Sequence, residues 1–370
     1  MIKKFWRALN RGFDFIMLAA VLLLLFLGVA VLYSLTLKGG IGEMKEVWDQ
    51  ITFCGIGLFL LFTFTFLDYR VWKDVAWFFY IFTIILLVAV LILGYTVFGA
   101  QRWIDLGFFR FQPAELAKLS LVFVLARYFS KVKPAIFPIR SLIVSGIITA
   151  VPVFLVSLQP DIGSAAVFVF VWLALLLLSG LKARFFALFA GIVALFTPLI
   201  WFLLKDYQRQ RILTFLEPEK DVLGAGYNVV QSKIAIGSGG IWGRGLGQGP
   251  QSQLDYLPVQ HTDFIFAVLA EGLGFVGALI TLGLFAVVFW RGFRTSKLAQ
   301  DEFGMYAAVG ITAFLLFQVF INIGMNLGIV PVTGIPLPFL SYGGSAIVVS
   351  LWGIGVIESI ILRHRKIAFK

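Results

Sequence analysis

Residues 15–33 read FIMLAAVLLLLFLGVAVLY, a run without a single charged side chain. A helix needs ~20 such residues to cross the hydrocarbon core of a bilayer. Lys3, Lys4, Arg7 and Arg11 precede the run, as in a secretory signal, but the apolar core of a cleaved signal is only ~7–15 residues long. The sequence therefore predicts an uncleaved first membrane span.

The composition of the whole chain agrees with a membrane protein. Its 370 residues are 60% hydrophobic and 13% charged, with a mean hydropathy of +0.97. Soluble domains are roughly 45–50% apolar and about 25% charged, so a soluble fold is excluded. The one cysteine, Cys54, lies in an apolar run, so no disulfide forms within the chain.

Ten stretches are long and apolar enough to be spans. They begin near Phe15, Gln50, Ala76, Pro113, Ser141, Asp161, Phe185, Asp263, Met305 and Gly343. We therefore predict an all-α integral membrane fold of about ten transmembrane helices, forming a single polytopic domain over residues 1–370. An even number of spans places both termini on one side of the membrane.

Basic residues choose that side, because Lys and Arg accumulate in cytoplasmic segments. With the termini inside, the inner segments hold 19 of the 30 Lys and Arg residues but 6 of the 19 acids. Both termini are therefore predicted to be cytoplasmic, with a long extracytoplasmic loop over about 205–262, between spans 7 and 8. Dispersal of the basic residues over several short segments argues against nucleic acid as a partner.

Four ionisable residues stand at the predicted ends of spans: Glu115, Lys118, Asp161 and Asp263. Each acid falls in the first turn of a span that runs inward, and Pro113 and Pro160 suit the first helical position. Charges at membrane depth are typical of functional sites, so a shared polar cavity is predicted. The pattern also fits acids that interact with helix dipoles and a Glu–Lys pair that neutralises itself.

The long loop is rich in glycine, with nine glycines between residues 224 and 249. Glycine permits a close approach of the backbone to a ligand. Residues 227–236 have a weakly amphipathic pattern that suits the membrane surface. Guanidinium groups match phosphate oxygens, which makes four cations candidates for phosphate contacts. They are Arg209, Arg211, Lys233 and Arg244. A solvated loop that contacts lipid headgroups would look the same.

A second predicted outer segment, residues 331–345, contains three prolines and is not one regular helix. It fits either a re-entrant loop that lines a cavity or a stiff connector before the last span. The histidines, His261 and His364, fall on opposite sides, and no zinc cluster or nucleophile triad is present. His261 also fits a helix-entry residue without chemistry.

Six stretches together resemble the SEDS family (shape, elongation, division and sporulation). They are Gln101 to Gly107, Phe111 to Lys118, Gln159 to Ser164, Gln231 to Gly240, His261 to Ala267, and Pro336 to Ser345. The resemblance covers essentially the whole chain in order. Tyr207 to Arg211, Gly224 to Asn228 and Gln251 to Leu254 favour the elongation branch.

The resemblance implies a peptidoglycan glycosyltransferase of the bacterial cytoplasmic (inner) membrane. Such an enzyme polymerises lipid II into glycan strands at the outer leaflet during cell elongation and releases undecaprenyl pyrophosphate. The family also implies two kinds of partner, a class B penicillin-binding transpeptidase and other membrane proteins of the elongation complex.

By the same resemblance, Asp263 matches the family's essential aspartate, and Glu115, Lys118 and Asp161 match other cavity residues, which completes the expected catalytic set. Substrate contacts are expected from Arg102, Arg209, Arg211, Lys233, His261 and Ser341. Two positions depart from the family pattern. Val259 and Gln260 stand where an acid is common, and Gly272 follows Glu271 where a second Glu is common.

The predicted reaction forms a β-1,4 bond, so a base must deprotonate the acceptor 4-hydroxyl. Asp263 is the expected base, because a carboxylate in a partly dry cavity can accept that proton. Carboxylates also suit Mg²⁺ or Mn²⁺, so Asp263 is alternatively a metal ligand that offsets the charge of the leaving pyrophosphate. Two rival functions remain, a lipid II flippase and a scaffold that only recruits a transpeptidase.

Overall fold

The computed structural model describes residues 12–37, 41–97, 100–105, 107, 110–132, 137–182, 191, 206–218, 221 and 224–364. Its long helices are α2 (Phe15–Thr36), α3 (Ile41–Phe66), α4 (Arg70–Leu93), α5 (Pro113–Lys131), α6 (Pro138–Leu158), α7 (Ile162–Leu178), α12 (Ile265–Leu298), α13 (Glu302–Asn326) and α14 (Gly344–Leu362). Helices are thus confirmed at nine of the ten positions where spans were predicted. The span expected near Phe185 lies outside the described residues.

Seven of these helices are long and apolar enough to cross a membrane. The exceptions among the long helices are α7, which has 17 residues, and α5, which carries four charged residues, Glu115, Lys118, Arg127 and Lys131. Hydrocarbon offers no water to backbone groups, so helices that satisfy their own hydrogen bonds are the expected solution. The chain is a multi-pass α-helical membrane protein.

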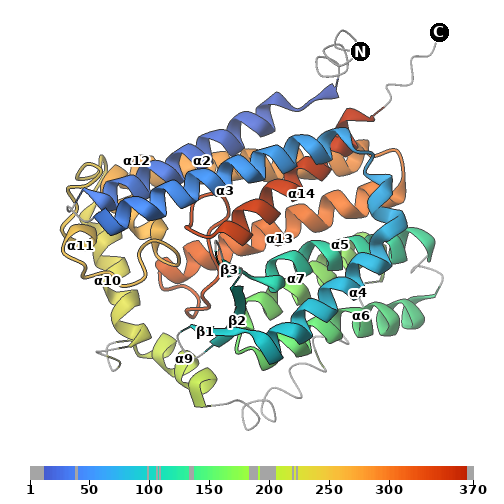
Figure 1. The fold of residues 1–370 in the computed structure, drawn as a ribbon, viewed down its shortest axis with the longest axis horizontal. Coiled ribbons are helices and arrows are strands. Elements are labelled where there is room, and N and C mark those ends of the chain that lie inside the picture. The colour runs from blue at the N-terminus through green and yellow to red at the C-terminus, as the bar shows by residue number, and fades with distance from the viewer. Residues whose placement is uncertain are drawn as a thin grey trace.

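Figure 1 shows the long helices side by side, with three short helices gathered at one end of the bundle. These are α9 (Asp206–Leu216), α10 (Ala225–Ser238) and α11 (Pro250–Gln253), all within the predicted extracytoplasmic loop. We call this end the loop end. The start of α2 and the end of α14 lie at the opposite end, the termini end, as an even number of spans requires.

Buried polar contacts tie the helices together at the termini end. Asp14 caps α2 by accepting from the amide of Met17, and its own amide donates to Glu358 of α14 at 3.0 Å. Arg291 of α12 pairs with the same Asp14 carboxylate. The first span is thereby locked to α12 and α14.

A small antiparallel sheet between α4 and α5 was not predicted from the sequence. Its strands are β1 (Tyr95–Val97), β2 (Ala100–Asp105) and β3 (Arg110–Phe111), in the order β1-β2-β3. Ile104 of β2 pairs with Phe111 of β3, two residues before α5 begins. Strands this short give little periodic signal, which explains the omission. The sheet thereby connects β2, which carries Arg102, to the residues that precede α5.

The helices differ sharply in how much they contact lipid. The most apolar window of α13 is 78% buried within the protein, against 28% for α3 and for α4. Helix α13 packs against α5, α7 and α12. It therefore forms the protein-facing centre of the bundle, while α3 and α4 turn much of their surface outward.

The glycines of the long loop have a structural reason that the sequence analysis missed. Helix α12 is broken at Gly274, whose φ is 68°, and the loop backbone lies directly against the break. A Cβ added at Gly239 would come within 2.1 Å of the carbonyl oxygen of Ala270, and one at Gly243 within 2.2 Å of that of Gly272. Close approach is needed here for packing against α12. Helix α10 also packs on α12 and α13.

Candidate active site

Asp161 caps the start of α7. Its Oδ1 accepts from the amide of Ser164 at 3.0 Å, and its Oδ2 accepts from the Ser164 hydroxyl at 2.9 Å. The side-chain amide of Gln112, the residue that precedes α5, donates to the same Oδ2 at 3.3 Å. The prediction that Pro160 occupies the first position of this helix is wrong, because the cap residue separates it from α7.

Arg102 reaches from β2 to the turn before α7. Its Nε donates to the carbonyl oxygen of Gln159 at 3.2 Å, and its terminal nitrogen donates to that of Pro160. A second terminal nitrogen lies 3.9 Å from Oδ1 of Asp161. The unpredicted sheet therefore places a guanidinium group beside the first of the candidate acids.

Asp263 lies in the turn before α12, and its backbone is fixed while its carboxylate is not. The carbonyl oxygen of Asp263 accepts from Nδ2 of Asn322 at 3.1 Å and from Nδ2 of Asn326 at 2.9 Å. Its carboxylate accepts from the Thr262 side chain. A Cβ added at Gly334 would lie 3.6 Å from Oδ2, an ordinary van der Waals distance, so the segment that contains Gly334 packs against the carboxylate.

Burial raises the pKa of Asp263 to about 6, which is the largest influence on the group. The hydrogen bond from Thr262 and the positive charges of Arg102 and Arg211 lower that pKa, while the negative charge of Asp161 raises it further. Two acids and two guanidinium groups from separate parts of the chain therefore act on one another within a single site. A carboxylic acid with a pKa near 6 suits proton transfer at neutral pH.

Asn322 and Asn326 were not singled out from the sequence. They lie four residues apart on α13, both fully buried, and therefore share one helix face. Besides holding Asp263, Asn322 donates to the carbonyl oxygen of Ile335 at 2.8 Å, and Oδ1 of Asn326 accepts from the amide of Ala267 at 3.1 Å. Two amides on one face of a span were the signal that could have revealed this clamp.

The proline-rich segment 331–343 folds over the Asp263 turn. The Ser341 hydroxyl donates to the carbonyl oxygen of Thr262 at 2.6 Å and accepts from the amide of Leu337 at 2.8 Å. The amide of Tyr342 donates to the carbonyl oxygen of His261 at 2.9 Å. Ser341 thus positions the turn, and its contact with substrate stays a prediction.

The imidazole of His261 pairs with an acid that the sequence analysis did not consider. Its Nδ1 lies 3.3 Å from a carboxylate oxygen of Glu46, near the start of α3. Both side chains are about one-third exposed, 30% and 36% respectively. The pair connects α3 to the turn that carries Asp263.

Glu115 and Lys118 form a closed pair one helical turn inside α5. Nζ of Lys118 donates to Oε1 of Glu115 at 2.6 Å, and both side chains are almost wholly buried. This is the self-neutralising arrangement that their spacing allowed. The pair belongs to the same end of α5 as Gln112, which bonds Asp161. A direct role for either residue in the reaction stays a prediction.

Two of the predicted phosphate contacts, Arg211 of α9 and Lys233 of α10, line the same cleft. Gly328, Val330 and Pro331 line the cleft between them. Arg211 is also one of the charges that lower the pKa of Asp263, which links the cleft electrostatically to that carboxylate. Arg209 lies half-buried on the same helix, and its contact with substrate stays a prediction.

This arrangement of residues can be compared with known proteins. The sequence profile of the family described as "Cell cycle protein", which groups FtsW, RodA and SpoVE, matches residues 15–366. The chain belongs to the FtsW/RodA/SpoVE family. That confirms the resemblance drawn from the sequence, because these are the SEDS proteins.

Individual members of the family match over nearly their full lengths. The peptidoglycan glycosyltransferase MrdB of Escherichia coli K12 is 44% identical over 370 residues, which is 100% of this chain and 98% of MrdB. The stage V sporulation protein E of Bacillus subtilis is 37% identical, over 94% of this chain and 96% of that protein.

Solved structures of relatives show the same fold. A chain of a peptidoglycan synthase complex that coordinates polymerization and crosslinking superposes with a TM-score of 0.83 at 31% identity, covering 96% of this chain and 99% of that one. The Rod shape determining protein RodA of Thermus thermophilus gives a TM-score of 0.69 at 29% identity, covering 96% of this chain and 97% of that one.

Glu271, which precedes the departure from the family pattern at Gly272, has a structural role here. Its two carboxylate oxygens accept from the amides of Gln251 at 2.9 Å and Ser252 at 3.0 Å, at the start of α11. The fully buried Glu271 therefore holds the end of the glycine-rich loop. Gln260, the other departure, donates to Asp255 within its own loop at 3.0 Å.

Within the part of the chain that the structure describes, no group of three or more His, Cys, Asp or Glu residues could hold a metal ion. Asp161, the acid whose charge raises the pKa of Asp263, already uses both carboxylate oxygens to cap α7. Mg²⁺ often binds through one or two carboxylates together with substrate phosphates. The residues present fit a cation shared between Asp263 and a pyrophosphate, and do not form a complete protein site.

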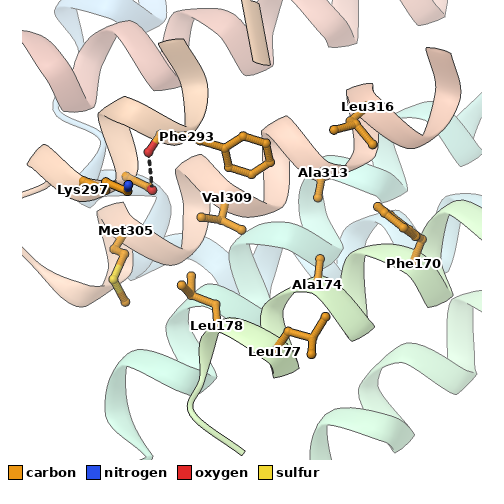
Figure 2. A pocket seen from close by; sticks show the side chains of 11 residues that line it. Phe170, Ala174, Leu177, Leu178, Phe293, Lys297, Met305, Val309, Ala313 and Leu316 are labelled. Atoms are coloured by element: carbon orange, nitrogen blue, oxygen red, sulfur yellow. Dashed lines mark hydrogen bonds between the residues drawn. The ribbon is translucent and has the colours of Figure 1, made fainter. Parts of the chain in front are cut away.

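A large groove of about 490 Å³ lies toward the termini end, away from these charges. Figure 2 shows its apolar lining from α7, α12 and α13. The side chains include Phe170, Leu177, Phe293, Met305, Val309 and Leu316, with Lys297 at one side. The groove offers no acid for proton transfer, so the chemistry is assigned to the loop end.

Proposed function

We propose that this chain is a peptidoglycan glycosyltransferase that joins lipid II disaccharides into glycan strands during cell elongation. The name of MrdB, at 44% identity over the whole chain, supports this activity. The observation that carries the proposal is the site itself. A carboxylic acid with a pKa of about 6, Asp263, stands under the influence of the guanidinium groups of Arg102 and Arg211.

The reaction has two electrostatic requirements, and the site supplies a group for each. The acceptor 4-hydroxyl oxygen attacks C1 of the donor sugar, and its proton passes to the Asp263 carboxylate. The C1–oxygen bond breaks, and undecaprenyl pyrophosphate leaves with the electron pair. Arg102 and Arg211 stabilise the charge that develops on the pyrophosphate, because guanidinium groups match phosphate oxygens in shape and sign.

The cleft between α9 and α10 extends this phosphate site. Lys233 lines it opposite Arg211, so a second cation meets the same anion. Asp161 acts indirectly, by capping α7 and holding Arg102 beside the Asp263 carboxylate. A Mg²⁺ or Mn²⁺ ion held by Asp263 together with the pyrophosphate would supply further positive charge to the leaving group.

The position of the site agrees with the substrate's position in the membrane. The sugar and pyrophosphate of lipid II project from the outer leaflet, and the loop end is outermost when the basic termini are cytoplasmic. The proposal therefore places the protein in the bacterial cytoplasmic membrane with Asp263 facing outward. The paired, buried Glu115 and Lys118 then support the start of α5 from within.

We further propose that the enzyme works with a crosslinking partner, a class B penicillin-binding transpeptidase, and with other membrane proteins of an elongation complex. Support comes from the similarity to a chain of a synthase complex in which polymerization and crosslinking are coordinated, with a TM-score of 0.83.

The test uses purified protein in liposomes that contain lipid II, scored for glycan chain growth on gels and for lipid II movement between leaflets. We expect wild-type protein to lengthen glycan chains and Asp263→Ala to abolish growth, while Asp105→Ala, which removes an exposed acid on β2, retains it. Movement between leaflets without chain growth would favour the flippase. Chain growth by well-folded Asp263→Ala would refute the assignment of the base.

A further inference from the structure

We propose that the loop Gly239–Gly249 is a membrane-inserted element, with Ile241 and Trp242 seated in the lipid bilayer at the loop end. The loop lies within a segment expected to be extracytoplasmic, where a solvated chain is the usual expectation. Its backbone bonding, its exposed side chains and its depth along α12 each point instead to lipid. The inference stands independently of the reaction assigned to the site.

The loop backbone is fused to α12 where that helix breaks. The carbonyl oxygens of Gly240 and Ile241 accept from the amides of Phe275 and Val276 at 2.9 and 3.1 Å. In the other direction, the amide of Arg244 donates to the carbonyl oxygen of Glu271 at 3.0 Å. Irregular backbone is tolerated at membrane depth only where its polar groups are satisfied. The loop and the broken helix satisfy each other.

The side chains that leave this fused backbone are apolar and exposed. Ile241 is 64% exposed and Trp242 is 80% exposed. They continue the outward face of α12, where Phe275 is 64% exposed and Leu279 is 57% exposed. Water would penalise such a surface at ~25 cal/mol per Å², whereas hydrocarbon accepts it.

The neighbouring cation does not disturb this surface. Arg244 is exposed, but its Nε donates to the carbonyl oxygen of Ser238 at 2.9 Å, which ties the side chain to the end of α10. Patches that contact a partner protein usually combine an apolar centre with a polar rim. The face formed by Ile241, Trp242 and Phe275 merges instead with the lipid-facing surface of a span, which favours the bilayer as its occupant.

The depth of the break along α12 also agrees with insertion of the loop into the bilayer. Trp290, which is 61% exposed, marks the membrane interface at the termini end, as Trp commonly does. At 1.5 Å per residue, a hydrocarbon core of ~30 Å extends about twenty residues from Trp290, to around Ala270. Gly274 is four residues nearer, so the break and Trp242 fall roughly 6 Å inside the hydrocarbon.

The single cysteine makes a direct test possible. In a Cys54→Ser background, Trp242→Cys and, separately, Ile241→Cys carry a nitroxide in vesicles of phosphatidylethanolamine and phosphatidylglycerol. Matched controls are Leu279→Cys, on the outward face of α12, and Tyr256→Cys, a 47% exposed loop residue. Power-saturation EPR then compares collisions with oxygen, which concentrates in hydrocarbon, and with a water-soluble nickel chelate.

We expect both loop labels to resemble Leu279→Cys, with oxygen collisions exceeding those of the chelate severalfold. If both labels resemble Tyr256→Cys, with the chelate dominant, the loop is solvated and the inference is wrong. Lipid-like behaviour of either label in protein that keeps its thermal unfolding midpoint supports insertion. Because neither readout depends on polymerisation, failure of this inference and failure of the proposed function are distinguishable.

Discussion

The starts of α7 and α12 place an aspartate in similar settings and use it in opposite ways. The carboxylate of Asp161 has a structural role, because both of its oxygens accept hydrogen bonds from Ser164 and one also accepts from Gln112. Asp263 is held through its backbone instead, because two asparagine side chains donate hydrogen bonds to its carbonyl oxygen. Its carboxylate caps no helix, and the charges of Arg102 and Arg211 act on it.

The comparison teaches that an acid at the start of a membrane helix becomes available for chemistry when other residues take over the task of positioning it. The carboxylate of Asp161 positions the residue itself by capping α7, so it is not available for chemistry. The Asp263 turn is anchored by Asn322 and Asn326, so its carboxylate keeps a free protonation equilibrium. Four predictions test this division of labour.

The largest effect is expected from replacing each acid by its amide. Asp263→Asn removes the base and should lower the polymerisation rate about 10³-fold, within the range of general-base catalysis. Asp161→Asn keeps a good helix cap and should cost about tenfold or less. Initial rates of lipid II polymerisation by the two purified variants measure the difference, and equal losses would contradict the division.

The asparagine clamp should have the next largest effect. Asn326→Ala frees the Asp263 turn without touching the carboxylate, so we expect a roughly 100-fold loss of rate through misplacement of the base. Thermal unfolding should show a loss of about 1–3 kcal/mol, because a buried carbonyl group loses a partner. Gln318→Ala, two turns earlier on the same helix, is the matched control and should retain more activity.

A smaller effect, on pH dependence, is expected from Arg211→Gln. Arg211 lowers the pKa of Asp263, so its removal raises that pKa above about 6. The base is active when deprotonated, so the rising limb of the pH–rate profile should move to higher pH, by roughly one unit. Lys233→Gln, which removes a cation from the same cleft, should lower the rate without moving the limb.

The smallest effect concerns Asp161 as a cap. Asp161→Ala should destabilise the fold by about 1 kcal/mol, whereas Asp161→Asn should be nearly neutral in thermal unfolding. Because the negative charge of Asp161 raises the pKa of Asp263, both variants should move the rising limb to lower pH. A shift to higher pH in either variant would show that the charges act differently.

The sequence was sufficient for the helices and for the residue types of the site. The run at residues 15–33 and its counterparts predicted nine helices now described, because hydrocarbon allows few alternatives to an apolar helix. Glu115, Lys118, Asp161 and Asp263 were predicted to share a polar cavity. The charges of Asp161, Arg102 and Arg211 act on Asp263, whereas Glu115 and Lys118 pair with each other. Their roles as catalytic or binding residues stay predictions.

What the sequence could not provide were contacts between segments far apart in the chain. Asn322 meets Asp263 across 59 residues, and Arg102 meets Gln159 across 57. Local patterns carry no information on such pairs. The loop glycines were misread for the same reason, since their partner is the break at Gly274, and glycine indicates close approach without naming what approaches.

The burial of α13 has a consequence for how the protein is made. Its inner face carries Gln318, Asn322 and Asn326, and buried amides are poorly suited to lipid. Three of its packing partners, α5, α7 and α12, are synthesised before it. Asp263, whose carbonyl oxygen accepts from both asparagines, is also made before α13, whereas Ile335, the second acceptor of Asn322, is made after it. The polar contacts of α13 are therefore completed only when the segment that follows this helix has been synthesised, and the site forms late in translation.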